Sequence, residues 1–203
     1  MFQRSRLPKL ILVLLKIVSL SLAILYEFEF EDDEVFTKCL DNPDGFKDKH
    51  GLFDFTNFSF ELGAEGLVVS GNFTSVWDVE PTDRIELRSR TLYWERGSWQ
   101  PTILNVYVSD FCKVMYDKNQ IWYISLTEHI SNKEEIRDKC VTHKGTLFVI
   151  EPYLMEIYFG AGMVFPSGRH RIIINMVAID LNNVTRPNGI CYEFVGTFFK
   201  VVK

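Results

Sequence analysis

A histidine and cysteine spacing offers the first candidate for chemistry in this chain. His129, Cys140 and His143 follow the pattern H-x10-C-x2-H and supply three side chains of the types that bind zinc. A structural zinc site needs four such ligands, and the fourth is missing here. Cys140 is also better used in a disulfide if the chain is exported. The sequence therefore predicts no metal and no other cofactor.

The sequence also contains no recognisable set of catalytic residues. Ser167 lies in Pro166-Ser167-Gly168, which is ordinary turn chemistry, and the chain has no G-x-S-x-G motif. Glu128-His129 and Glu151 would form an acid–base pair only if the fold brought them together. Because nothing supplies a nucleophile, a base and an orienting group together, the sequence predicts a binding protein rather than an enzyme.

The first residues look like a targeting segment. Residues 1–9 carry three basic side chains and no acid, and residues 10–26 are apolar apart from Lys16 and two serines, which is the order found in a secretory signal. Ser21 and Ala23 are small residues suited to cleavage after Ala23. The alternative is an uncleaved membrane anchor, but Lys16 near its middle would cost about 3 kcal/mol in the bilayer. We therefore expect residues 1–23 to be a signal peptide and the protein to be secreted and extracellular.

Removal of residues 1–23 makes the chain strongly acidic. It leaves 18 Lys and Arg against 27 Asp and Glu, a net charge of −9. A polyanion would be repelled by such a protein, so nucleic acid is not an expected partner.

Three Asn-x-Ser/Thr sequons agree with export. They start at Asn57, Asn72 and Asn183. In a secreted protein such triplets predict N-linked glycans at exposed positions.

Four cysteines in an exported chain predict two disulfides. A bond between Cys112 and Cys140 would close a loop within residues 109–140, and one between Cys39 and Cys191 would join the first strand to the last. On the chain-entropy model these loops contribute about 3.5 and 5 kcal/mol. The residues alone leave all three pairings of the four cysteines open.

Residues 109–140 are predicted to be a short helical insert on a β-rich body. Phe111, Val114 and Met115 recur at helical spacing behind Ser109 and Asp110, two residue types that cap helices. A second apolar cluster follows around Trp122 and Tyr123.

The rest of the chain has the alternation of short β-strands. Ile85 and Leu87, for example, alternate with charged residues, which is typical of an antiparallel strand with one face in solvent. Pro101 cannot donate to a strand ladder and predicts an edge or a bulge. The predicted strands span residues 35–40, 52–62 with a bulge after Phe55, 67–79, 84–94, 99–108, 146–150, 153–159, 170–180 and 190–202. Residues 24–34 are expected to be a solvated acidic lead-in.

This spacing predicts a mainly β fold, an antiparallel two-sheet β-sandwich formed as a single domain by residues 35–203.

A combination of residues in the second half of the chain resembles a known family. It consists of Phe111-Cys112, Asp117, Trp122-Tyr123, Cys140, Gly145, Glu151-Pro152, the run from Pro166 to Ile172, and Cys191 before Gly196-Thr197-Phe198. These residues resemble a family of secreted insect proteins numerous in flies. That family is similar in turn to the ML lipid-recognition domains, which include the ganglioside activator protein and the lipopolysaccharide co-receptor of innate immunity.

The motif that carries this resemblance is a Pro-x-Gly loop before a Tyr-Arg-Ile strand, followed by a late cysteine. Here His170-Arg171-Ile172 and Cys191 take those places, with His170 where an aromatic residue usually stands. The resemblance covers residues 99–203, and residues 35–96 match only in strand pattern and Cys39. It implies an immunoglobulin-like, ML-like sandwich that admits a lipid between its sheets, and the disulfides Cys39–Cys191 and Cys112–Cys140, which the strand layout also favours.

The resemblance further implies a chemosensory or lipid-carrier role, with a membrane receptor as a further partner. The expected ligand is a lipid or another small apolar molecule. Strand parity and the position of the insert predict these residues around it: Trp122, Tyr123, Met155, Ile157, Phe159, Ile172, Ile174, Met176, Tyr192, Phe194 and Phe198. Trp122 and Tyr123 are expected at the rim of the opening. The alternative is that these side chains fill a packed core, in a secreted structural or protein-interaction module such as a receptor accessory or reproductive-tract protein without a ligand.

Overall fold

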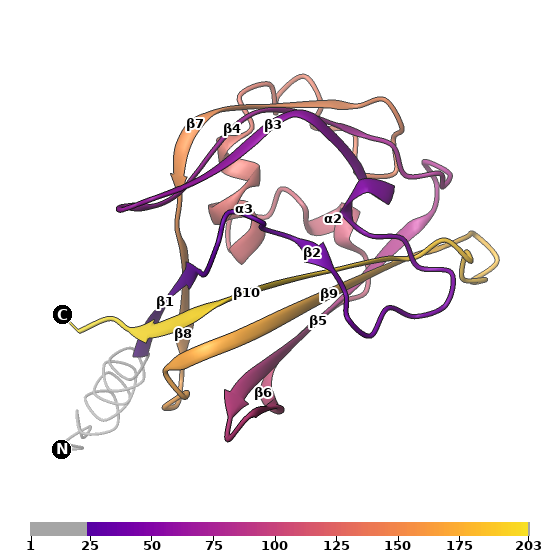
Figure 1. The fold of residues 1–203 in the computed structure, drawn as a ribbon. Coiled ribbons are helices and arrows are strands. Elements are labelled where there is room, and N and C mark those ends of the chain that lie inside the picture. The colour runs from indigo at the N-terminus through magenta and orange to yellow at the C-terminus, as the bar shows by residue number, and fades with distance from the viewer. Residues whose placement is uncertain (1–23, 203) are drawn as a thin grey trace, which may run out of the picture.

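The computed structural model describes residues 24–202, which form a mainly β fold with two antiparallel sheets, as the sequence predicts (Figure 1). The strands are β1 (Ile24–Phe30), β2 (Thr37–Lys38), β3 (Phe53–Gly63), β4 (Gly66–Ser75), β5 (Arg84–Glu95), β6 (Ser98–Val108), β7 (Leu147–Met155), β8 (Ile157–Ala161), β9 (Gly168–Ile179) and β10 (Ile190–Lys200). Four short helices accompany them: η1 (Lys49–Gly51), α2 (Phe111–Val114), α3 (Ile121–Ser125) and η2 (Thr127–His129). The predicted signal peptide, residues 1–23, lies outside the described residues.

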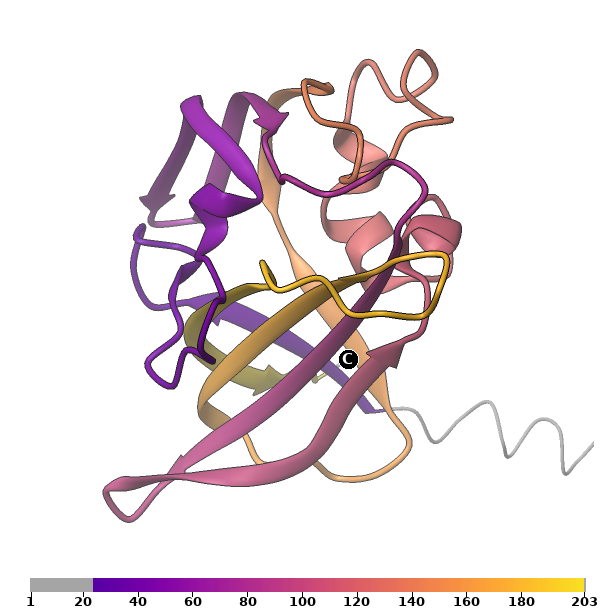
Figure 2. The ribbon, with the colours of Figure 1, turned by 90° about the vertical axis from the view of Figure 1, so that its right-hand side faces the viewer.

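The two sheets are unequal in size. The larger has the order β6-β5-β9-β10-β1-β8, with β2 added against β10, and the smaller has the order β3-β4-β7. Figures 1 and 2 show the smaller sheet lying across the larger one. This arrangement is sandwich-like, and the inner faces of both sheets contribute to one main core.

The predicted strand 153–159 is divided between the two sheets. Met155 ends β7 and pairs with Leu67 in the smaller sheet, whereas Ile157 starts β8 and pairs with Phe28 in the larger sheet. Glu156 is the corner between them. Both apolar side chains still pack against the main core, because the chain turns from one inner face to the other.

The predicted acidic lead-in is wrong for residues 24–30. They form β1, which pairs with β10 on one side and β8 on the other. Tyr26, Phe28 and Phe30 are buried, while Glu27 and Glu29 alternate with them on the opposite face. The acidic composition of this segment favours a solvated loop, but its aromatic and acidic residues alternate as in a β-strand with an aromatic inner face. Residues 31–34 are exposed and irregular, as expected.

The next predicted strand, residues 35–40, shrinks to the two residues of β2. Phe36 adopts a φ of 63°. This left-handed conformation interrupts the extended backbone and turns the Phe36 ring toward the core.

The predicted bulge in β3 is confirmed. The register with β4 shifts between Asp54 and Asn57. The extra residue keeps Phe58 on the same face as Phe55, so that both pack against the main core.

Both disulfides have the pairing that the resemblance implies, Cys39–Cys191 and Cys112–Cys140. Cys39 and Cys191 pack with Ile173 in a small cluster separate from the main core. Cys112–Cys140 closes the insert, whose helices α2 and α3 lie at one side of the sandwich (Figures 1 and 2).

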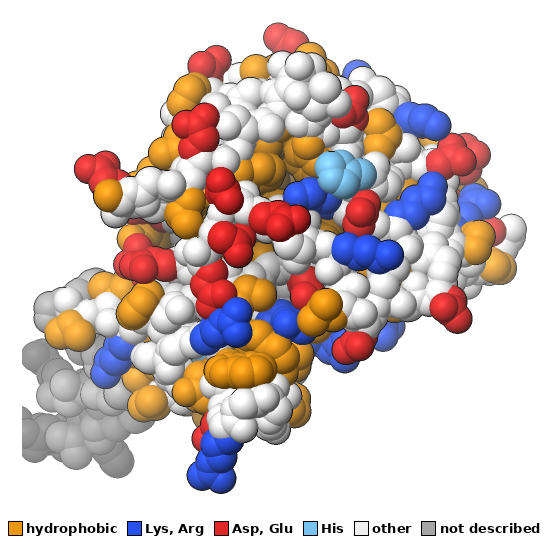
Figure 3. Space-filling model, viewed as in Figure 1, with side chains coloured by type: hydrophobic (Ala, Val, Ile, Leu, Met, Phe, Trp, Pro, Cys, Tyr) orange, Lys and Arg blue, Asp and Glu red, His pale blue; other side chains and the backbone are white. Residues whose placement is uncertain are grey.

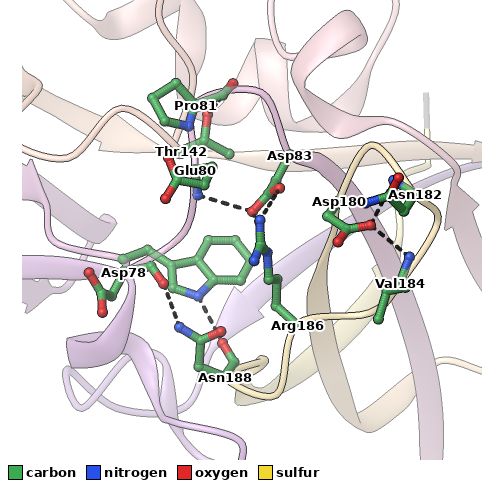
Figure 4. A network of polar contacts seen from close by, with 11 residues as sticks. Asp78, Glu80, Pro81, Asp83, Thr142, Asp180, Asn182, Val184, Arg186 and Asn188 are labelled. Carbon is green, nitrogen blue, oxygen red and sulfur yellow. Dashed lines mark hydrogen bonds and ion pairs between the residues drawn. The ribbon is translucent and has the colours of Figure 1, made fainter.

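One end of the sandwich is closed by polar contacts (Figure 4). The buried Trp77 donates from Nε1 to the Asn188 carbonyl oxygen at 2.8 Å, and Arg186 donates twice to the Asp83 carboxylate at 3.0 Å. Burial acts to raise the pKa of Asp83, but hydrogen bonds from Arg186 and from the Glu80 N–H together hold this pKa below its usual value. These contacts join the β4–β5 connection to the β9–β10 loop.

The other end contains a buried histidine. The His170 ring lies 4.8 Å from both Phe165 and Phe198, and 4.9 Å from Tyr93. Its Nδ1 is 2.7 Å from the Gly168 carbonyl oxygen, which can only accept, so Nδ1 carries the proton. Among residues 24–202 the buried Nε2 has no hydrogen-bond partner. Burial therefore lowers the pKa of His170 and keeps the ring neutral.

Because His170 is buried as a neutral ring, we expect the folded protein to lose stability in acid. Because the pKa of His170 is lower in the folded chain than its usual value of 6.5, the unfolded chain binds the extra proton first. The contribution of His170 to the unfolding free energy is fully present above about pH 6.5. It is lost as the pH falls through the pKa of His170 in the folded chain. His170→Phe should flatten this part of the curve of unfolding free energy against pH, whereas His50→Gln, at an exposed position, should not. Equal curves for wild type and His170→Phe would contradict the assignment.

Candidate ligand cleft between the sheets

The two sheets close tightly at their ends but not in the middle. On the interior strand β9, His170 near one end and Met176 and Ala178 near the other are buried. Ile172 and Ile174 lie between them, face the same core, and are only half-buried. An inward side chain on an interior strand keeps accessible surface only where the opposite sheet does not cover it. There is therefore open space between the sheets.

Aromatic rings line the accessible side of this space. The Phe36 ring lies 5.7 Å from Phe60, 5.4 Å from Tyr192 and 5.6 Å from Phe194. All four side chains are half-buried. Figure 3 shows a hollow with hydrophobic side chains at its base between the two sheets. We call the space lined by Phe36, Phe60, Tyr192, Phe194, Ile172 and Ile174 the intersheet cleft.

A neighbouring cavity of about 260 Å³ lies between β1, the β3–β4 turn and the β7–β8 corner. Phe28 and Phe30 line it and also contact Phe194, at ring distances of 5.6 and 5.8 Å, so the cavity adjoins the intersheet cleft. Its large apolar lining residues are Phe28, Phe30, Leu62, Leu67, Leu154 and Met155. The volume is slightly below the roughly 300–1,000 Å³ of drug-sized sites, which suits a small ligand or one end of a longer one.

The surroundings of the cavity are acidic. Glu65 and Glu156 border it, and Glu27 and Glu29 contribute from β1, with side chains on the opposite face of that strand from Phe28 and Phe30. The Tyr158 hydroxyl lies 3.1 Å from Glu27 and 3.4 Å from Glu156, and burial together with these carboxylates raises the pKa of Tyr158 to about 12. These charges disfavour an anionic ligand in the cavity.

Lys49 supplies a cation beside the intersheet cleft. Its Nζ donates to the Val35 carbonyl oxygen at 2.9 Å and lies 5.8 Å from the centre of the Phe60 ring. Burial lowers the pKa of Lys49, while nearby Glu34 and Asp48 act in the opposite direction. Because these acids accompany the ammonium group, Lys49 does not make the opening a basic site.

Tyr192 provides a polar group inside the cleft. Among residues 24–202 its hydroxyl forms no hydrogen bond, and the side chain keeps some accessible surface. Burial nevertheless raises the pKa of Tyr192 to about 12, so the phenol remains protonated at neutral pH. It can therefore donate a hydrogen bond to a ligand.

The predicted lining residues fall into three groups. Met155, Met176 and Phe198 are buried in the core. Ile157, Phe159, Ile172, Ile174, Tyr192 and Phe194 are half-buried and pack against it. Trp122 and Tyr123 lie in the insert, on the opposite side of the sandwich from β3 (Figure 2).

The insert is part of the wall and does not border the intersheet cleft. Trp122 donates from Nε1 to the Val114 carbonyl oxygen at 3.0 Å, and Tyr123 is buried. The Tyr153 hydroxyl donates to the Ser125 carbonyl oxygen at 2.6 Å and so fastens α3 to β7.

Phe36 and Phe60 line the intersheet cleft, and the buried Phe28 and Phe30 line the neighbouring cavity. None of these four residues is in the predicted set. The alternation from Tyr26 to Phe30 is the sequence signal that could have identified Phe28 and Phe30.

The residues considered for zinc or catalysis have structural contacts. His129 stacks on Tyr153 with a ring distance of 3.7 Å, and His143 accepts from the Cys140 N–H at 3.2 Å. Within residues 24–202 no group of three or more His, Cys, Asp or Glu side chains could hold a metal ion. Ser167 is exposed in the turn before Gly168, whose φ of 123° requires glycine.

A comparison with models of known protein families and a search of curated proteins found no match to this chain.

An open cleft predicts different costs for two Phe→Ala substitutions. Phe148 is fully buried, and its truncation should cost about 3–5 kcal/mol of unfolding free energy. Phe194→Ala should cost clearly less in protein extracted free of lipid, because the space around Phe194 is partly empty already. Chemical denaturation of both variants measures the difference. Equal costs would show that the sheets close over Phe194 in solution.

Proposed function

We propose that this chain is a secreted, non-enzymatic binding protein that holds a small apolar ligand between its two sheets. The observation that carries the proposal is the incomplete burial of Ile172 and Ile174 on an interior strand, next to four half-buried aromatic rings. Apolar surface of this kind gains free energy when a ligand covers it. The resemblance to ML lipid-recognition domains supports the same function and suggests a lipid-carrier or chemosensory role.

The chemistry of the lining favours an uncharged ligand with one hydrogen-bond acceptor. The glutamates around the cavity oppose a carboxylate. The neutral Tyr192 hydroxyl offers one donor inside an otherwise apolar lining, which is the usual composition of a site that orients an apolar molecule. A hydrocarbon chain that carries one ester, ketone or alcohol group would match such a site.

Native mass spectrometry of protein secreted by insect cells tests the proposal. A co-purifying mass that extraction into organic solvent removes is the expected result. Apo protein only, together with no displacement of an environment-sensitive dye by dodecane or dodecyl acetate, would favour an interaction module with a packed core.

Tyr192→Phe tests the proposed donor. Loss of one neutral hydrogen bond should weaken dodecyl acetate binding about three- to tenfold and leave dodecane binding unchanged. Tyr153→Phe is the matched control, because the Tyr153 hydroxyl already donates to Ser125. Equal loss for dodecane and dodecyl acetate in Tyr192→Phe would contradict a hydrogen-bonding role.

Secretion is supported by the two disulfides and by the positions of the sequons. Asn57 and Asn183 are exposed, whereas Asn72 is half-buried on β4 directly opposite Asn57. No helix within residues 24–202 is long and apolar enough to cross a membrane.

Expression in insect cells should deliver the protein to the medium with N-linked glycans. Asn57→Gln and Asn183→Gln should each remove one glycan, read as a mass step after glycosidase treatment. The crowding of Asn57 and Asn72 on neighbouring strands predicts that Asn57→Gln raises occupancy at Asn72. Retention of an uncleaved membrane species would refute secretion.

A further inference from the structure

The edge strands of the two sheets differ in how they are protected from pairing. Within residues 24–202 the outermost strands are β6 and β8 of the larger sheet and β3 and β7 of the smaller one. An open edge exposes unpaired N–H and C=O groups and invites another chain unless charges, proline, bulges or short length prevent it.

Three of these strands carry such protection. β8 has only five residues. β3 carries Asp54 and Glu61, a register shift, and a sequon at Asn57. β7 carries Glu151 and Pro152 beside its own register shift. Each of these features opposes continued pairing on that edge.

β6 carries its protection only at one end. Pro101 and an irregular register opposite Thr91 lie near its start, and the Leu104 N–H is held by the Thr102 hydroxyl at 3.1 Å. From Asn105 the strand pairs regularly with β5, and residues 102–108 contain no charged side chain. Ile103, Val106 and Tyr107 are 70%, 44% and 60% exposed. This is a β-branched and aromatic edge without a charged residue to block it.

We propose that β6 pairs antiparallel with β6 of a second copy of this chain, joining the larger sheets of both copies into one. A two-fold axis through Val106 places Val106 opposite itself, Leu104 opposite Val108, and Asn105 opposite Tyr107. Each residue that faces the core is then paired with a residue that faces the core of the second copy, because the two positions of each pair differ by an even number of residues. No charge on the strand faces its own copy, so the edge is complementary to itself.

The outer face beside β6 is already ordered for such a contact. The Tyr107 hydroxyl donates to Glu86 at 2.9 Å, and the Arg88 guanidinium lies 5.5 Å from the Tyr107 ring. These contacts fix an exposed aromatic side chain against β5, so pairing would cost little additional side-chain entropy.

Val106→Lys and Leu147→Lys form a matched pair for the test. Leu147 is on the β7 edge and is 43% exposed, close to the 44% of Val106, so both variants add the same charge at the same exposure. Analytical ultracentrifugation of the secreted protein over a wide concentration range should show dimers for wild type and Leu147→Lys. Val106→Lys should weaken dimerisation at least about tenfold, because the axis sets two ammonium groups opposite each other.

Amide hydrogen exchange provides a second measurement of β6 pairing. Amides of residues 104–108 should become more protected as the wild-type concentration rises. If Val106→Lys does not fold, Tyr107→Lys puts a charge at an exposed position of the same edge, opposite Asn105 of the second copy, and should also weaken dimerisation. A monomer at every concentration, or dimers that Val106→Lys and Tyr107→Lys leave unchanged, would overturn the proposal. Neither result bears on ligand binding, since the intersheet cleft uses other strands.

Discussion

The packing of rigid aromatic rings between two open sheets is the constraint on which this structure depends. Phe53, Phe55, Phe58 and Phe60 all point inward from β3. The Phe36 ring contacts Phe60 on one side and the β10 rings Tyr192 and Phe194 on the other. Most ring pairs are edge-to-face or tilted, with centroid distances such as 5.7 Å for Phe36 and Phe60. Rings in this geometry fill space less adaptably than branched aliphatic side chains, because each ring is a large rigid plane that prefers offset or edge-to-face contacts. Where rings border the open side, the sheets stay incompletely covered.

Such a core requires firm attachments at its borders. At one end Trp77 and the Asp83–Arg186 pair join the β4–β5 connection, which runs from one sheet to the other, to the β9–β10 loop of the larger sheet. At the other end the Tyr26 hydroxyl accepts from the Phe165 N–H and donates to the Phe165 carbonyl oxygen, at 2.7 and 3.0 Å. The insert closes the side opposite β3. With these borders fixed, the accessible surface is confined to the middle of the sandwich.

The sequence revealed the elements whose pattern is local, and it failed where position depends on distant partners. Local sequence features predict the bulge after Phe55, the short helices around Trp122 and the edge position of Pro101. They do not predict the change of sheet at Glu156, because the alternation from Met155 to Ile157 continues unbroken through the corner. The sequence does not predict β1, because its glutamates are typical of a solvated segment, although one face of a half-buried strand is also expected to be polar. The same misinterpretation leaves Phe28 and Phe30 out of the predicted lining of the cavity beside the cleft.

The energy of the half-buried rings argues for an occupant of the cleft. Full burial of a Phe side chain contributes about 1.5–3 kcal/mol, so four aromatic rings that each keep about a tenth to a third of their surface exposed forgo about 1–4 kcal/mol in total. A typical unfolding free energy is about 5–15 kcal/mol, so this loss is not negligible. The two disulfides, at about 3.5 and 5 kcal/mol on the chain-entropy model, are large enough to offset it. A fold stabilised in this way can keep apolar surface uncovered without unfolding, and a ligand that covers Phe36, Phe60 and Phe194 recovers the free energy that the empty protein lacks.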